Sequence, residues 1–238
     1  MSTEAGPSSS GAALVRASWV LVLATALVLA PLALASWRLT GRPINPATAR
    51  TIAHGWWTWL PYLLLAPGLV AAATAPVMAA ARAGAALSPA RALVAAGRGL
   101  VLAIVPALAV LATVVLTLPA AGVPGLMVAG LFVLAPLAGA DHGGRPLAAI
   151  ADSVARTRAR PWVAIALGAG IVLATVLVAA LLARWSVPAL IKKPKPAALA
   201  YVGNLTWLRL GLAAAITLLA AGALATVSAR WTRPATAG

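Results

Sequence analysis

The residues best suited to chemistry lie between positions 131 and 162, where the chain leaves one apolar run and enters the next. Asp141 and His142 are adjacent, and Asp152 and Arg156 follow. A carboxylate beside an imidazole can perform acid–base chemistry, and arginines can bind a phosphate. The simpler interpretation is a solvated turn followed by a helix with an i,i+4 ion pair. We therefore treat Asp141, His142 and Asp152 as a candidate polar site, and expect no catalytic residue because the cluster has no nucleophile.

The rest of the chain offers little further chemistry. It contains no cysteine, which excludes disulfides and thiolate metal sites. It also lacks a glycine-rich phosphate loop, an HExxH motif and a GxSxG motif. We therefore expect no cofactor and no metal. The three acidic residues lie outside the apolar runs, whereas ion-coupled carriers place a carboxylate inside the membrane despite a cost of about 2.5–3.5 kcal/mol. This disfavours a coupled transporter or pump.

The composition of the chain indicates the kind of fold that holds this candidate polar site. The chain is 63% hydrophobic and 9% charged, with a mean hydropathy of +0.99, whereas a soluble domain has about 25% charged residues. A helix needs about 20 apolar residues to cross a bilayer core of roughly 30 Å. Unbroken Ala- and Leu-rich runs do not fit the alternation of a barrel. We predict an all-α polytopic bundle of about six transmembrane helices with short amphipathic interfacial helices. The runs are 17–37, 56–81, 99–119, 122–140, 162–185 and 207–228.

The domain organisation is simple. Residues 1–13 are small and polar and are predicted to form a disordered tail. Residues 14–233 form a single six-span domain, and 234–238 form a C-terminal tail. Residues 1–35 also fit a signal peptide with an A-x-A site at Ala33, but the apolar core is longer than a usual signal sequence, which favours a retained first span.

Several local patterns refine the bundle. Pro46, Pro89 and Pro146 each start a short basic segment ahead of an apolar run, which suggests a repeated unit of surface helix and span. The uncharged turn 119–124 predicts an antiparallel hairpin of the third and fourth runs. Small residues recur every fourth position in the last two runs, which we therefore expect to be interior helices. These stripes are Ala166, Gly170 and Ala174, and Ala213, Thr217, Ala221 and Ala225.

The net charge of +15 predicts anionic partners. Its basic residues stand one or a few at a time beside span ends, where they meet lipid headgroups at about 1 kcal/mol each, so nucleic acid is not expected. The neutral 119–124 turn, flanked by basic loops, places both termini in the cytoplasm, with loops 38–55 and 184–209 outside. We expect a helix over 146–160 to lie flat on the cytoplasmic face, burying Leu147, Ile150, Ala151 and Val154. The expected headgroup-binding residues are Arg91, Arg98, Arg156, Arg158 and Arg160.

One resemblance follows from these residues. Within residues 131–162, the acidic Asp141 closes an apolar run and a turn with Gly143 and Gly144 follows. A helix with the pattern Ala149-x-x-x-Ser153 and arginines before Trp162 come next. Over about 88–185 the chain resembles uncharacterised bacterial integral membrane proteins related to the membrane domain of glycerophosphoryl diester phosphodiesterases, although Asp141 stands where that pattern has Glu. The phosphodiester chemistry in that family belongs to a separate soluble domain. The resemblance therefore implies a helical membrane module and no enzyme.

Three functional hypotheses remain. The first is a non-enzymatic bacterial inner-membrane protein involved in envelope organisation or lipid handling, with anionic membrane lipids as partners. The second is the transmembrane permease subunit of an ABC-type transporter, which would bind a protein partner subunit through a cytoplasmic surface helix. The third is an intramembrane lipid-modifying enzyme centred on Asp141 and His142.

Overall fold

The computed structural model describes residues 7–40, 46–83, 85, 87–121, 127, 130–192 and 196–231, and this part of the chain is all-helical. The described part contains no strand, which confirms the predicted fold class. Its helices, in chain order, are α1 (Pro7–Thr40), α2 (Pro46–Arg82), α3 (Pro89–Ala121), α5 (Ala135–Asp141), α6 (Pro146–Arg158), α7 (Pro161–Lys192) and α8 (Pro196–Trp231).

Proline marks where most of these helices begin. Every helix above except α5 starts at a proline, whose fixed φ suits the first helical position and whose missing N–H is not needed there. Helix α1 thus begins at Pro7, inside the segment 1–13 expected to be a tail. The sequence predicted three units, each a surface helix followed by a separate span. Only the unit that starts at Pro146 consists of two helices, α6 and α7. In the other two units a single helix, α2 or α3, continues through Pro61 or Pro106.

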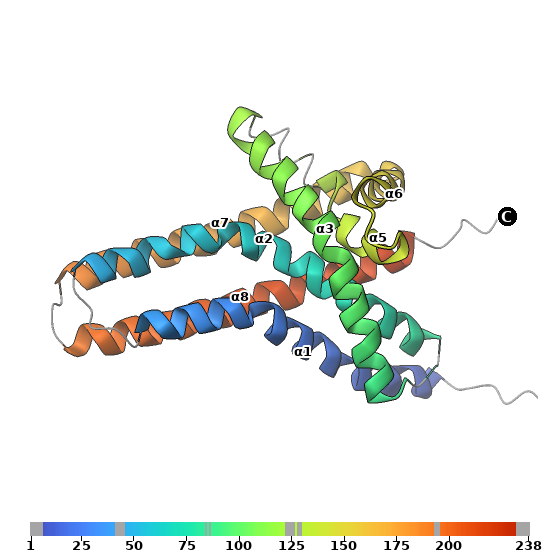
Figure 1. Ribbon diagram of the computed structural model, residues 1–238, viewed down its shortest axis with the longest axis horizontal. Helices are drawn as coiled ribbons and strands as arrows, with labels where there is room; N and C mark the ends of the chain where they lie inside the picture. The colour runs from blue at the N-terminus through green and yellow to red at the C-terminus, as the bar shows by residue number, and fades with distance from the viewer. Residues whose placement is uncertain are drawn as a thin grey trace, which may run out of the picture.

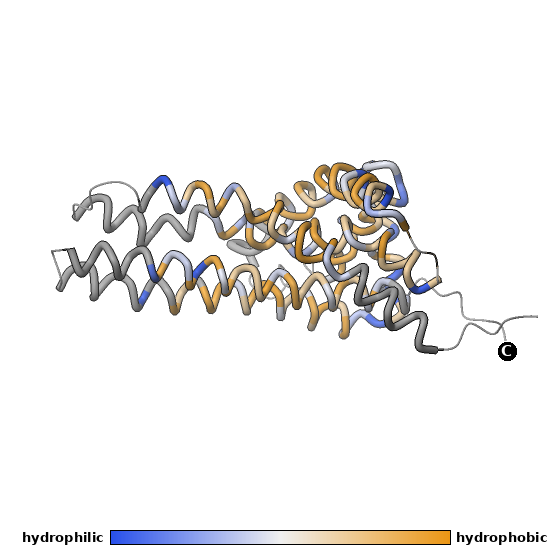
Figure 2. Tube along the Cα trace, turned by 90° about the horizontal axis from the view of Figure 1, so that it is seen from below, coloured by the Kyte–Doolittle hydropathy of each residue, from blue (hydrophilic) through white to orange (hydrophobic). Residues whose placement is uncertain are grey.

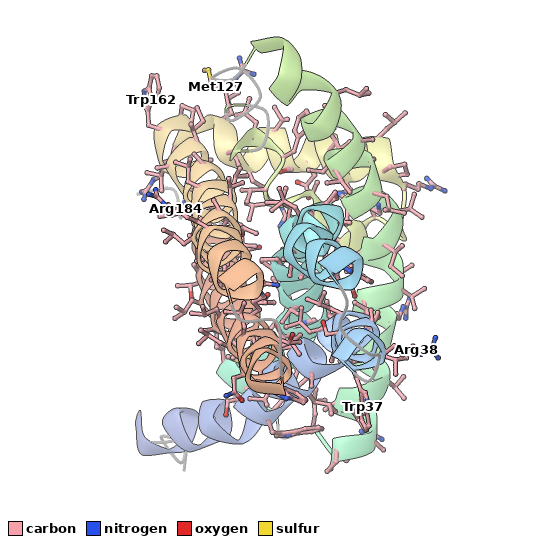
Figure 3. All side chains as sticks on the ribbon, turned by 90° about the vertical axis from the view of Figure 1, so that its left-hand side faces the viewer. Trp37, Arg38, Met127, Trp162 and Arg184 are labelled. Carbon is pink, nitrogen blue, oxygen red and sulfur yellow. The ribbon has the colours of Figure 1, made fainter. Side chains whose placement is uncertain are left out.

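The helices are arranged around α2. Helices α1, α2, α7 and α8 lie alongside one another, while α3 runs across them (Figure 1). Helix α2 contacts α1, α3, α5, α7 and α8, and its apolar segment is the most enclosed of the long helices. The first residues of α1 and the last residues of α8 lie towards the same end of the bundle, which is also the end where α5 and α6 are found (Figure 1). Hydrophobic residues run along the described parts of the long helices (Figure 2), and Trp162 and Arg184 project outward (Figure 3).

Five helices of the described chain are long and apolar enough to cross a membrane, one fewer than the predicted six. They contain the segments Ser18–Arg38, Trp59–Arg82, Pro89–Thr113, Pro161–Val178 and Asn204–Ser228. The exception is the run 122–140, where a turn at 132–134 precedes α5. Helix α5 has 7 residues, and at 1.5 Å per residue it extends only about 10 Å. The predicted return beside α3 is correct, since Gly139 approaches Pro106 and Gly144 approaches Leu102, which is an antiparallel pairing.

Backbone hydrogen bonding explains why this break is tolerated. In an apolar environment an unpaired carbonyl is costly, so irregular backbone persists only where protein groups bind it. The carbonyl of Leu131 accepts a 2.8 Å hydrogen bond from the Ser153 hydroxyl of α6, and that of Phe132 accepts one of 2.9 Å from the Ala135 amide. Helix α5 then packs its buried residues, including Pro136 and Leu137, against α2 and α3.

Glycines cover carbonyls that prolines leave without a helical donor. Pro76 has no N–H to donate to the carbonyl of Ala72, and Gly99 of α3 packs so closely there that a Cβ would lie 2.5 Å from the Ala72 oxygen. Pro106 likewise frees the carbonyl of Leu102, which lies 3.0 Å from where a Cβ of Gly139 would be. Helices α2 and α3 therefore pack backbone against backbone near Pro76, and α3 and α5 do so near Pro106.

The small-residue stripes were predicted correctly in one helix and wrongly in the other. In α8, Ala213, Thr217 and Ala221 are buried, as expected, and Ala225 is half-buried. In α7 the predicted stripe of Ala166, Gly170 and Ala174 is exposed, and the buried face carries Ala164, Gly168, Val172 and Thr175 instead. Both faces of α7 are small, so size does not distinguish them; the contact of Gly130 with the backbone at 164–165 decides which face is covered. The enclosed helix is α2 rather than α7 or α8.

Candidate functional site

Helix α6 packs on the protein through hydroxyls and a methyl group rather than through the predicted apolar stripe. Its buried residues are Ala149, Ser153 and Thr157, whereas Leu147 is 82% exposed. The Ser153 hydroxyl donates to Leu131, and the Thr157 hydroxyl lies 3.4 Å from the same oxygen. In the expected set, Leu147 and Ala151 are exposed and Ile150 and Val154 are half-buried. This stripe is therefore not the face that packs on the protein, and its contact with lipid stays a prediction. The small polar face packs there instead because the broken helix needs hydrogen-bond donors, which only that face of α6 supplies.

Two glycines turn the chain from α5 into α6. Gly143 and Gly144 have φ angles of +62° and +81°, a region that residues with a Cβ rarely adopt. The turn is closed by the amide of His142, which donates to Ala138 over 3.0 Å, and by that of Gly144, which donates to Gly139 over 2.8 Å. This sharp reversal brings the end of α5 against the side of α6.

The result is a four-residue ion-pair network, which we call the Arg156 network. Arg156 Nη2 lies 2.5 Å from Asp152 Oδ2 and 3.0 Å from Asp141 Oδ2, and His142 Nε2 lies 3.2 Å from the same Asp152 oxygen. The predicted i,i+4 pair of Asp152 and Arg156 is confirmed. The structure also brings in Asp141 and His142, so the whole candidate polar site is one cluster.

Charge within the network opposes acid–base catalysis by Asp152. Burial alone raises the pKa of Asp152, but the hydrogen bond and positive charge of Arg156, with His142, outweigh it and hold that pKa below its ordinary value. Burial likewise lowers the pKa of Arg156, whereas its contacts with Asp152 and Asp141 raise it above the ordinary value. An effective general base near neutral pH needs a raised carboxyl pKa. Asp152 and Arg156 therefore form a stable ion pair.

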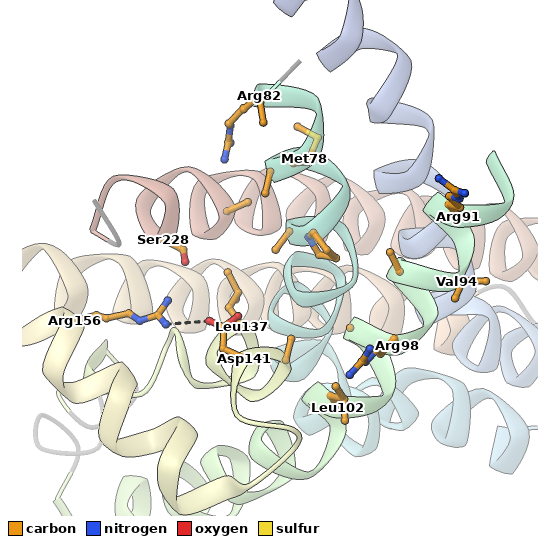
Figure 4. A pocket seen from close by; sticks show the side chains of 18 of the residues that line it. Met78, Arg82, Arg91, Val94, Arg98, Leu102, Leu137, Asp141, Arg156 and Ser228 are labelled. Carbon is orange, nitrogen blue, oxygen red and sulfur yellow. Dashed lines mark hydrogen bonds and ion pairs between the residues drawn. The ribbon is translucent and has the colours of Figure 1, made fainter. Parts of the chain in front are cut away.

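Beside this network is a cleft of about 1050 Å³, comparable with the largest small-molecule sites at roughly 300–1,000 Å³. It is bounded by the end of α2, the first turns of α3, the end of α5 and the end of α8 (Figure 4). Its charged lining residues are Arg82, Arg91, Arg98, Arg156 and Asp141, and its larger apolar ones include Met78, Val94, Leu102 and Leu137. The cleft thus joins a cationic rim to apolar walls.

The predicted headgroup-binding arginines divide into two groups. Arg91, Arg98 and Arg156 line the cleft, and Arg82, which the sequence did not single out, joins them. Arg158 and Arg160 are exposed and do not line it. In the described part of the chain, no group of three His, Asp or Glu side chains could hold a metal ion.

Arg209 is the clearest residue that sequence reasoning misplaced. It was assigned to the outer loop 184–209, but it lies within α8, is 1% exposed, and belongs to the apolar segment Asn204–Ser228. The available signal was helical periodicity, since Arg209 precedes Ala213 by four residues and so extends the small-residue stripe towards the start of α8. A buried arginine in an apolar helix is rare because burying its charge is costly, so Arg209 is a further candidate for a functional residue.

Comparisons with protein families, with curated proteins and with solved structures find no match to this chain. The structure itself assigns the class: five long apolar helices in the described residues define a multi-pass membrane protein.

Proposed function

We propose that the protein is a non-enzymatic lipid-handling protein of the bacterial inner membrane, and that the arginine-rimmed cleft is its lipid-binding site. One observation carries the proposal: a single cleft combines four arginines with apolar walls. Guanidinium groups suit phosphate oxygens because their paired N–H groups match them in geometry and charge. The apolar walls suit the adjoining hydrocarbon.

The position of the cleft supports this assignment. Arg82 and Ser228 line it and are the last residues of two apolar segments, and Arg91 lies near the start of a third. Residues at the ends of spans lie at headgroup depth. We place this end on the cytoplasmic side. Five helices are long enough to span, but we assign both chain termini to this side because α5 brings the chain back beside α3. We also propose that the chain shares a helical membrane module, and no enzymatic chemistry, with the membrane domain of glycerophosphoryl diester phosphodiesterases.

The absence of enzymatic activity is part of the proposal. Asp141 and Asp152 both pair with Arg156, and His142 contacts Asp152. This arrangement supports a structural or binding role for the cluster, because every group that could move a proton is engaged with another. An Asp141→Asn, His142→Ala double variant that lost an intrinsic lipid-modifying activity would contradict this part of the proposal.

The test compares two pairs of arginines. An Arg82→Gln, Arg98→Gln variant removes two cleft cations, and none of Arg82, Arg91 and Arg98 forms an ion pair with another described residue. An Arg158→Gln, Arg160→Gln variant removes the same charge from exposed positions outside the cleft. Two headgroup contacts at about 1 kcal/mol each predict a roughly 30-fold loss of affinity for anionic lipid in the cleft variant.

Native mass spectrometry of the purified protein, with anionic and zwitterionic lipid added in competition, measures this loss. We expect the control pair to retain one tightly bound anionic lipid at physiological salt, because all four cleft arginines are unchanged in it. Equal retention by the two variants would refute the cleft as the binding site. A stoichiometric ATPase retained through purification would instead favour the permease subunit.

A further inference from the structure

The two carboxylates that bind Arg156 differ in where they lie. Asp152 is on the same helix as Arg156, is also contacted by His142, and does not line the cleft. Asp141 comes from the end of α5, lines the cleft together with Arg156, and has a side chain that is 60% exposed, against 23% for Asp152. Both carboxylates contact Nη2 of Arg156, Asp152 from within α6 and Asp141 from α5 at the cleft. Figure 4 shows the contact with Asp141.

The contact with Asp141 is the weaker of the two by geometry and exposure. It is 3.0 Å long, against 2.5 Å for Asp152. The Arg156 side chain is only 16% exposed, but it stays paired with Asp152 when Asp141 leaves, and the exposed Asp141 carboxylate is then hydrated. A phosphate that offers two oxygens to the guanidinium binds it more strongly than a single carboxylate oxygen does. Asp141 can therefore be displaced from Arg156, whereas Asp152 remains.

We propose that Asp141 occupies the position of a ligand phosphate, and that the ligand of the cleft is an amphiphile with a phosphate headgroup which displaces Asp141 from Arg156. The inference rests on the proposed function and specifies its ligand. Displacement turns the Asp141 carboxylate towards water and leaves Arg82, Arg91, Arg98 and Arg156 facing the headgroup. The hydrocarbon lies against the apolar wall that includes Met78, Val94 and Leu137.

Asp141 then lowers the affinity of the cleft for phosphate headgroups, most strongly for those with a net negative charge. A phosphate must compete with the carboxylate for Arg156 and must tolerate the same carboxylate as a nearby like charge. A zwitterionic headgroup experiences this repulsion less because its positive group compensates it. Replacing Asp141 with asparagine removes both effects while preserving the size of the side chain.

The experiment measures binding to the full-length protein in detergent by isothermal titration calorimetry. The probes are dihexanoyl phosphatidic acid, dihexanoyl phosphatidylcholine and glycerol 3-phosphate. The variants are Asp141→Asn and, as a control with the same change in net charge, Glu4→Gln. Thermal unfolding confirms that each variant is folded.

We expect Asp141→Asn to bind phosphatidic acid about tenfold more tightly than the wild type, a factor equal to ~1.4 kcal/mol. Glu4→Gln should bind it as the wild type does. Asp141→Asn should gain less affinity for phosphatidylcholine than for phosphatidic acid, because the choline ammonium already offsets the repulsion by Asp141. Unchanged affinity for phosphatidic acid in Asp141→Asn would overturn the displacement while leaving the lipid site intact. No preference for phosphatidic acid over phosphatidylcholine in any variant would instead refute the proposed function itself. Glycerol 3-phosphate bound as tightly as phosphatidic acid would show that the ligand is a soluble phosphate and overturn the amphiphile.

Discussion

Substituting alanine for Gly99 tests the backbone-to-backbone packing of α2 and α3. A Cβ at position 99 would lie 2.5 Å from the oxygen of Ala72 and 3.3 Å from its carbonyl carbon. Both atoms are backbone, so neither can rotate away as a side chain could. Gly97, two residues earlier in α3, has no atom within 4 Å of its Cβ position and provides the matched control.

The magnitude follows from two opposing effects. Alanine is favoured over glycine within a helix by about 0.5–1 kcal/mol, and both variants gain this. Only Gly99→Ala must also separate two helices, and overpacking of this kind costs about 1–3 kcal/mol. The two variants should therefore differ by about 1–3 kcal/mol. For a protein of this size each kcal/mol shifts the melting temperature by about 2–4 °C.

Thermal unfolding in mild detergent, followed by tryptophan fluorescence, gives the comparison directly. Gly97→Ala should melt at or above the wild-type temperature, and Gly99→Ala should melt below it. If Gly99→Ala is as stable as Gly97→Ala, the close approach of α3 to the Ala72 carbonyl is not a feature of the folded protein.

Three further predictions follow from α6 and its contacts. Ser153→Ala should destabilise the fold by about 1–3 kcal/mol, because it leaves the carbonyl of Leu131 without its 2.8 Å donor; Thr226→Ala, at an exposed hydroxyl on α8, should have little effect in the same melting assay. Since the pKa of Asp152 is depressed from 3.8, its pairing stabilises the protein above about that pH and is lost as the pH falls through the lower folded value. The melting temperature of Asp152→Asn should thus be lower at neutral pH and approach that of the wild type in acid; a constant difference would contradict this. An Ala155→Cys variant, in a chain with no other cysteine, should react with an impermeant maleimide in inverted vesicles only, and labelling in right-side-out vesicles would reverse the orientation.

Local properties of the chain determined much of this protein. The hydropathy of the long runs was sufficient to predict an all-helical membrane bundle, because lipid requires long apolar helices with internally paired backbone. Helix starts were marked by prolines such as Pro46, Pro89 and Pro146, because φ at the first helical position is a property of one residue. The i,i+4 pairing of Asp152 with Arg156 was likewise available from helical spacing.

Tertiary structure decided which faces are covered and which groups meet. The run 122–140 has the hydropathy of a span, yet the chain turns at 132–134, and Ser153, distant in sequence, donates to the carbonyl of Leu131 beside the turn. Helical periodicity places Arg209 on the stripe of Ala213, but its burial to 1% exposure depends on the helices packed around it. The cleft depends on residues from five separate helices. Hydropathy measures the affinity of each segment for lipid, whereas these features depend on hydrogen bonds and contacts between segments, and those exist only once the helices have packed.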